Sequence, residues 1–184
     1  MKYTSRLTAV ACVLLLFVLP SQSPAQTGWS KSFEHAVVVT AEQRASQAGR
    51  DILQQGGNAV DAAVAVQFAL AVTLPRAGNI GGGGFMVVRL TDGSSRALDF
   101  REQAPLQAHK DMYMREGEYV TRLSRKGGLA SGVPGVVDGM VKAMEQYGNL
   151  SLNQVIQPAI ELARKGYRLS YRQAEALNDN KKGL

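Results

Sequence analysis

Residues 59–74 read AVDAAVAVQFALAVTL, which is apolar on nearly every side when it is wound as a helix. A soluble protein holds such a helix in its centre, where other elements pack against several of its sides. Its many alanines predict close approach of those neighbours. Asn58 is a typical N-cap residue, Asp61 lies in the first turn where the helix dipole favours an anion, and Pro75 ends the helix. The fold therefore has to be built around this helix.

The sequence before this central helix predicts a short strand and a further helix. Residues 36–40, AVVVT, are rich in β-branched side chains and predict a strand of the buried type. Thr40 and Gln43 have the T-x-x-Q spacing of a capping box, which predicts a helix over 41–55. The two glycines that follow predict its C-terminus.

The sequence after the central helix predicts a hairpin and three more helices. The runs 85–90 and 95–100 flank an Asp-Gly pair, which is a strong local signal for a β-hairpin. Pro158 predicts a kink or a shift in the helix at 152–165. S-x-x-Q capping boxes mark the start of the last two helices. The predicted helices span 136–147, 152–165 and 171–178.

Four consecutive glycines separate the central helix from the hairpin. A phosphate cradle needs a strand, a glycine loop and then a helix, whereas here a helix precedes the glycines and a strand follows them. A flexible linker is disfavoured because elements of the buried type flank the glycines and no serine accompanies them. Glycine is also used where the backbone has a positive φ or where a Cβ would collide. We therefore expect a structural loop that threads a packed interior next to a site, made of Gly81, Gly82, Gly83 and Gly84.

The second predicted strand ends in the sequence DFRE, residues 99–102. The planar guanidinium of Arg101 could bind a carboxylate through two parallel hydrogen bonds, which a lysine cannot reproduce. The alternative is a structural ion pair between Arg101 and either Asp99 or Glu102. From these residues alone, the ion pair is the more common outcome.

The first 25 residues have the layout of a secretory signal peptide. Lys2 and Arg6 precede an apolar run at 7–19, and Ala25 ends a group of small residues suited to cleavage. The apolar run of about 13 residues is shorter than the roughly 20 that a membrane span requires. We expect an exported protein, periplasmic or secreted, with no stable membrane span after cleavage.

The composition of residues 26–184 excludes several classes of protein. Removing Lys2 and Arg6 from the 21 basic residues leaves 19 against 15 acidic residues, a mild and scattered net charge of +4. No basic, aromatic-rich patch predicts nucleic-acid binding. Cys12 is removed with the signal peptide, so neither a disulfide nor a thiol nucleophile is expected. His35 and His109 lack ligands at metal-binding spacing, so we expect no metal and no cofactor.

Three stretches of the chain resemble the start of the large subunit of γ-glutamyltranspeptidases (glutathione hydrolases). The resemblance covers about residues 36–177, in the same order as in the family, and includes the four glycines and the D-F-R-E motif. The stretches read GGNAVDAAVAVQFALAVTLPRAGNIGGGGFMVVR, ALDFREQAP and LASGVPGVVDGM.

The resemblance implies an N-terminal-nucleophile hydrolase, an α/β (α+β) protein with an αββα sandwich that forms by autocleavage of one precursor into two chains. Members transfer the γ-glutamyl group of glutathione and similar compounds to water, an amino acid or a peptide. The nucleophile is a threonine at the new N-terminus of the small subunit. The family's motif implies that Arg101 binds the substrate α-carboxylate. The oxyanion donors lie in the small subunit, so the glycines at 81–84 are not expected to form the oxyanion hole.

The chain departs from the family because residues 1–184 do not include the small subunit that the resemblance implies. Four threonines are unsuited to be the nucleophile. Cleavage before Thr27 would place a glutamine where signal peptidase needs a small residue, and Thr40, Thr73 and Thr91 have cap, core and turn positions. We expect residues 26–184 to be a fragment of the large subunit, inactive alone, with its central helix and hairpin lacking partners. Two alternatives stay open: a truncated, non-catalytic protein that binds γ-glutamyl or other carboxylate ligands, and a related acylase or poly-γ-glutamate-cleaving enzyme.

Overall fold

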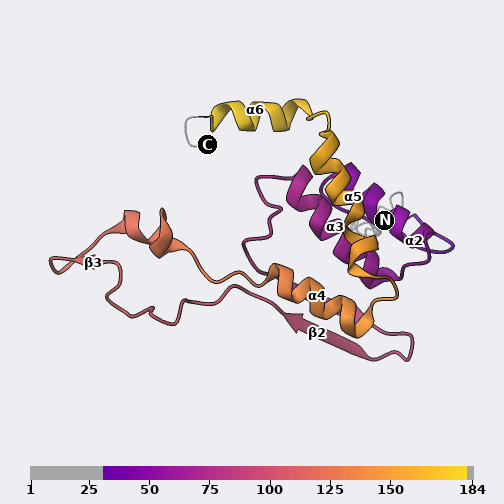
Figure 1. Cartoon of the computed structure of the whole chain (residues 1–184), viewed down its shortest axis with the longest axis horizontal. Coiled ribbons are helices and arrows are strands. Elements are labelled where there is room, and N and C mark those ends of the chain that lie inside the picture. Colours follow the sequence, from indigo (N-terminus) through magenta and orange to yellow (C-terminus); the bar gives the residue numbers. More distant parts are fainter. Residues whose placement is uncertain (1–30, 182–184) are drawn as a thin grey trace, which may run out of the picture. The chain divides into compact units, whose positions relative to one another are not determined.

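The structure, a computed structural model, describes residues 31–181 and divides into two compact units, Met1–Ala36 and Val37–Leu184 (Figure 1). In the first unit, residues 31–36 form neither helix nor strand. The predicted signal peptide, with Cys12, and Thr27 lie outside the described residues. The elements below all belong to the second unit.

Helix α3, Ala59–Thr73, is the centre of this unit, as predicted. It packs against α2 (Gln43–Gln54), α4 (Val136–Tyr147) and α5 (Leu152–Lys165), and eight of its 15 residues are buried. Small residues allow the close packing: a Cβ on Gly49 of α2 would lie 2.8 Å from Val66 Cγ2 of α3. The all-round apolar sequence of α3 is explained by these three neighbours.

A buried carboxylate fixes the start of α3. Asn58 Oδ1 accepts the backbone N–H of Val60 (2.8 Å) and of Asp61 (3.1 Å), while Asp61 Oδ2 accepts the N–H of Asn58 (2.7 Å). Asn58 is thus the N-cap, as predicted, and with Asp61 it forms a reciprocal capping box. Asp61 is fully buried and also accepts the N–H groups of Asn149 and Leu150, in the loop between α4 and α5. One side chain thus joins the start of α3 to the start of α5.

The prediction at the N-terminal end of the unit was wrong in two respects. Residues 36–40 form no strand, and Val39 is 83% exposed. A strand requires a hydrogen-bonding partner, and neither two-stranded sheet in the described part of the chain includes this segment. Helix α2 is capped by Glu42, whose carboxylate accepts the N–H of Arg44 at 2.7 Å, rather than by Thr40. The Thr40 hydroxyl instead lies 2.8 Å from Ser46 Oγ.

The predicted hairpin is confirmed. Strands β1 (Phe85–Arg89) and β2 (Ser95–Asp99) pair antiparallel, with Phe85 opposite Asp99. The turn between them contains Gly93 at φ 84°, a conformation that favours glycine. Helix α4 lies along β2 and separates the hairpin from α3 (Figure 1). One face of the hairpin therefore joins the core through Met86, Val88, Leu98 and Phe100.

The three C-terminal helices are also confirmed. Helices α4 and α5 have the predicted bounds, and α6 (Tyr171–Asp179) ends one residue later than predicted. Ser151 and Ser170 form the predicted capping boxes. Pro158 lies inside α5 without ending it. Within residues 31–181, no helix combines the length and apolar character needed to cross a bilayer.

The segment between the hairpin and α4 has little regular structure. It contains the two-residue strands β3 (Met114–Arg115) and β4 (Glu118–Tyr119), and the short helical turns η2 (Thr121–Ser124) and η3 (Gly128–Ala130). Gln103 and Val133 exchange both backbone hydrogen bonds, at 3.0 and 2.8 Å. This isolated bridge closes the segment only two residues from Arg101.

Candidate functional site at the end of the hairpin

The backbone of Arg101 is held where the hairpin ends. Phe100 and Gly84 exchange backbone hydrogen bonds of 3.1 and 3.4 Å, which extend the β1–β2 pairing by one residue pair. The next N–H, that of Arg101, donates to Asp99 Oδ1 at 3.0 Å. The Phe100 side chain packs onto α4, where a Cβ on Gly139 would collide with the ring. These contacts therefore fix the backbone position from which the Arg101 side chain extends.

The guanidinium of Arg101 is only weakly engaged. Its Nη2 lies 3.6 Å from Glu102 Oε1, and the two side chains are 58% and 42% exposed. Within residues 31–181 its N–H groups form no other ion pair and no side-chain hydrogen bond. The alternative predicted for this arginine, an ion pair with a motif carboxylate, is thus present with Glu102, but a single long exposed contact contributes little. Most N–H groups of the Arg101 guanidinium therefore remain available to a ligand.

Close approach explains two of the four consecutive glycines. A Cβ on Gly83 would overlap the backbone of Arg101 and Glu102, and a Cβ on Gly84 would lie 2.8 Å from the Phe100 ring. None of the four has a positive φ, and Gly81 has no neighbour within 4 Å. Within the described residues, the four glycines alternate between exposed and half-buried. That the loop threads a packed interior stays a prediction for the complete protein.

The sequence analysis missed the third segment of the site. Gly82 O accepts the N–H groups of Gly135 (2.8 Å) and Val136 (3.1 Å), at the start of α4. A Cβ on Gly135 would overlap the carbonyl of Phe100, and a Cβ on Gly132 would lie 3.2 Å from Gln103 O, which is closer than most side chains come to a neighbour. The same close-approach argument that was applied to the four glycines could have found them.

The described residues around this site offer the guanidinium of Arg101 and no threonine suited to be a nucleophile. Thr73 is buried and its hydroxyl donates to Ala69 O at 2.9 Å, and Thr91 lies in the turn at the opposite end of the hairpin. Within residues 31–181, no group of three or more side chains could hold a metal ion. The arrangement can bind and orient a carboxylate, and by itself it cannot attack a carbonyl.

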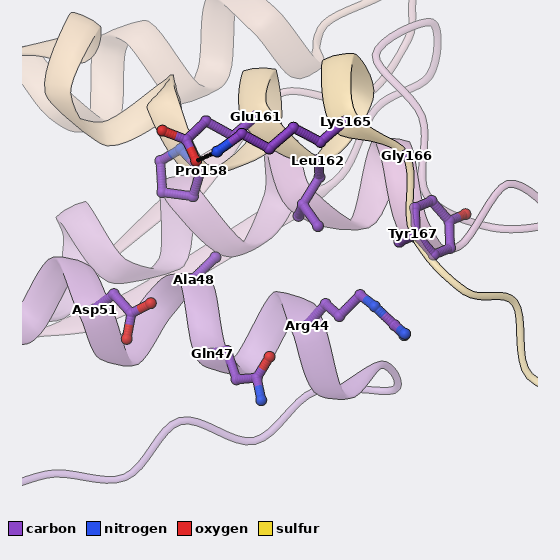
Figure 2. A pocket seen from close by; sticks show the side chains of 10 residues that line it. All are labelled: Arg44, Gln47, Ala48, Asp51, Pro158, Glu161, Leu162, Lys165, Gly166 and Tyr167. Atoms are coloured by element: carbon purple, nitrogen blue, oxygen red, sulfur yellow. Dashed lines mark hydrogen bonds and ion pairs between the residues drawn. The ribbon is translucent and has the colours of Figure 1, made fainter.

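A separate pocket of about 410 Å³ lies between α2 and the C-terminal end of α5 (Figure 2). Its charged side chains are already paired: Lys165 with Glu161 at 2.9 Å, and Arg44 with Glu42 at 2.9 Å. Arg44 also lies against the ring of Tyr167, and burial raises the pKa of that tyrosine. Arg101 does not line this pocket. We therefore place the candidate site at the hairpin.

Comparison with known proteins identifies the family. The family model described as gamma-glutamyltranspeptidase matches residues 45–184. A glutathione hydrolase proenzyme of Pseudomonas sp. (strain A14) is 50% identical over 163 residues, which are 88% of this chain and 27% of that protein. The glutathione hydrolase proenzyme of Escherichia coli (strain K12) is 47% identical over 155 residues, 80% of this chain and 27% of that protein.

Solved structures agree with the sequence comparison. The crystal structure of Helicobacter pylori gamma-glutamyltranspeptidase superposes with a TM-score of 0.79 at 49% identity, over 83% of this chain and 44% of that one. The chain belongs to the γ-glutamyltranspeptidase family, and its helices and strands form part of the N-terminal-nucleophile hydrolase fold. It spans about a quarter of the length of the curated relatives that it matches.

Proposed function

We propose that this chain is the N-terminal part of the large subunit of an exported γ-glutamyltransferase and glutathione hydrolase. In this proposal residues 26–184 follow the signal peptide, and the rest of the precursor supplies a small subunit that begins with the threonine nucleophile. The chain alone is inactive, because the described residues offer no suitable nucleophile. Family membership supports the reaction class, since relatives that share up to 50% identity are named glutathione hydrolase proenzymes.

In the complete enzyme, Arg101 binds the α-carboxylate of the γ-glutamyl donor. The observation that supports this role is the half-exposed guanidinium, which has one weak ion-pair partner and extends from a backbone held by three segments. Holding the carboxylate at one end of the glutamyl group sets the position of the γ-carbonyl at the other end. The threonine hydroxyl then attacks that carbonyl, the amine leaves, and water or an acceptor amine takes the acyl group.

The test is donor kinetics of the complete precursor with Arg101→Ala and Arg101→Lys. Loss of charge-assisted hydrogen bonds of about 1.5–3 kcal/mol should raise KM for a γ-glutamyl donor by about 10- to 150-fold. Arg101→Lys should reverse little of this increase in KM, because a lysine cannot form the two parallel hydrogen bonds.

Arg96→Ala is the matched control, since Arg96 is another exposed arginine on β2 and its contact is to the neighbouring carbonyl of Ser95. It should leave KM unchanged. Near-normal donor kinetics in Arg101→Ala would instead assign Arg101 to its ion pair with Glu102 and remove the support for a substrate contact.

A further inference from the structure

Phe85 presents an aromatic ring to solvent at the start of β1. Side chains alternate along this strand: Met86 and Val88 pack toward the core, whereas Phe85 and Val87 point outward and are 65% and 77% exposed. Core packing therefore does not explain why residue 85 is a phenylalanine. Its position opposite Asp99 places it on the outer face of the hairpin, close to Arg101.

The ring of Phe85 is in contact range of the Arg101 guanidinium. Arg101 Cζ lies over the ring, 5.8 Å from its centroid, within the roughly 6 Å range of a cation–π interaction. A guanidinium that stacks on an aromatic face keeps its N–H donors free, because they lie in its own plane and point outward from its edge. The ring therefore need not compete with a carboxylate for these donors.

Gly83 leaves room for the backbone from which Arg101 extends. The backbone hydrogen bonds between Gly84 and Phe100 bring Gly83 next to Arg101. A Cβ on Gly83 would lie 2.6 Å from Arg101 Cα and would overlap the N–H of Glu102. A side chain at residue 83 would therefore displace the arginine that lies over the Phe85 ring.

We infer that Phe85 is a positioning residue, which holds the Arg101 guanidinium with its donor edge toward the substrate α-carboxylate. This inference rests on the proposed function of Arg101. Glu102 is the competing partner, but its contact is long and exposed, so a substrate carboxylate can replace it at little cost. The ring contact does not need to be broken, because it uses a different surface of the guanidinium.

The experiment compares Phe85→Leu and Phe85→Tyr in the complete precursor. Leucine keeps an apolar side chain but removes the π face, and an exposed cation–π contact corresponds to an increase in donor KM of about two- to five-fold. We expect kcat to stay unchanged and tyrosine to restore KM. Val87→Ala is the matched control, because Val87 is on the same face and has no contact with Arg101; it should leave KM unchanged.

A double variant separates positioning from general packing. If the ring acts through Arg101, Phe85→Leu should have no further effect on kcat/KM in an Arg101→Ala background. An equal loss of kcat/KM in both backgrounds would overturn the inference. Equal increases of KM together with equal losses of melting temperature in Phe85→Leu and Val87→Ala would overturn it as well. If Arg101→Ala raises KM but Phe85→Leu does not, this inference fails and the proposed function stands. If Arg101→Ala itself has normal KM, the proposed function fails and Phe85 has no substrate-binding group to position.

Discussion

Asp61 shows how much of this fold depends on one buried side chain. Its two oxygens accept N–H groups from Asn58, Asn149 and Leu150, so three part-buried backbone donors are satisfied by one buried side chain. Gly148 has to be a glycine beside it, because a Cβ there would lie 2.8 Å from Asp61 Oδ1. An isosteric change at residue 61 is therefore a sensitive test of this arrangement.

We expect Asp61→Asn to lower the free energy of unfolding of the complete protein by about 2 kcal/mol, because an amide NH₂ would face backbone donors that then lose their acceptor. Denaturant titration measures this change. The control is Asp138→Asn, which removes an exposed pair with Lys142 and should cost less than about 1 kcal/mol. Equal, small losses in both variants would show that the hydrogen bonds to Asp61 add little to stability.

At the scale of elements, local signals predicted the helices and the hairpin, but not whether an isolated segment would find a distant strand partner. The capping boxes at Asn58, Ser151 and Ser170 mark real helix starts, because their hydrogen bonds connect residues only two or three apart. The strand predicted at 36–40 did not form, because a strand is decided by a partner that propensity cannot identify.

The candidate site was predictable only in part, for the same reason. The D-F-R-E motif pointed to Arg101 through a family resemblance, whereas the residues alone favoured an ion pair. The contacts that fix the site, from Gly82 to the start of α4 and between Gln103 and Val133, join segments that lie far apart in the sequence. Phe85 was predicted as a strand residue, but its orientation toward Arg101 depends on the register of the hairpin.

The glycine loop allows a prediction at this scale, because its four members are not equivalent. We expect Gly83→Ala to destabilise the complete protein by about 1–3 kcal/mol and to raise donor KM, since the added methyl group must displace the backbone of Arg101. Gly81→Ala is the matched control, with open space around it and no positive φ, and should be neutral or slightly stabilising. Thermal melting and donor kinetics measure both effects. Equal behaviour of the two variants would contradict a role for close approach at residue 83.

At the scale of the molecule, we expected the central helix and the hairpin to lack the partners that the missing part of the precursor supplies. Helices α2, α4 and α5 pack against α3 within this chain, as its all-round apolar sequence predicted. The outer face of the hairpin fits the expectation better: within the described residues, no third strand pairs with β1 or β2, and Phe85 and Val87 are exposed. Because the chain spans about a quarter of its curated relatives, we propose that the rest of the precursor covers this face.

We therefore expect residues 26–184, expressed alone, to self-associate through the hairpin. Light scattering and size-exclusion chromatography measure the association, which should fall in a Phe85→Thr/Val87→Thr variant because the exposed apolar area is reduced. Val39→Thr is the control: Val39 is 83% exposed but lies outside the hairpin, so its replacement should not restore a monomer. A monodisperse, cooperatively melting fragment would contradict the proposal that this face needs a covering chain. Equal rescue by both changes would contradict a specific role of the hairpin, since association would then follow total apolar exposure.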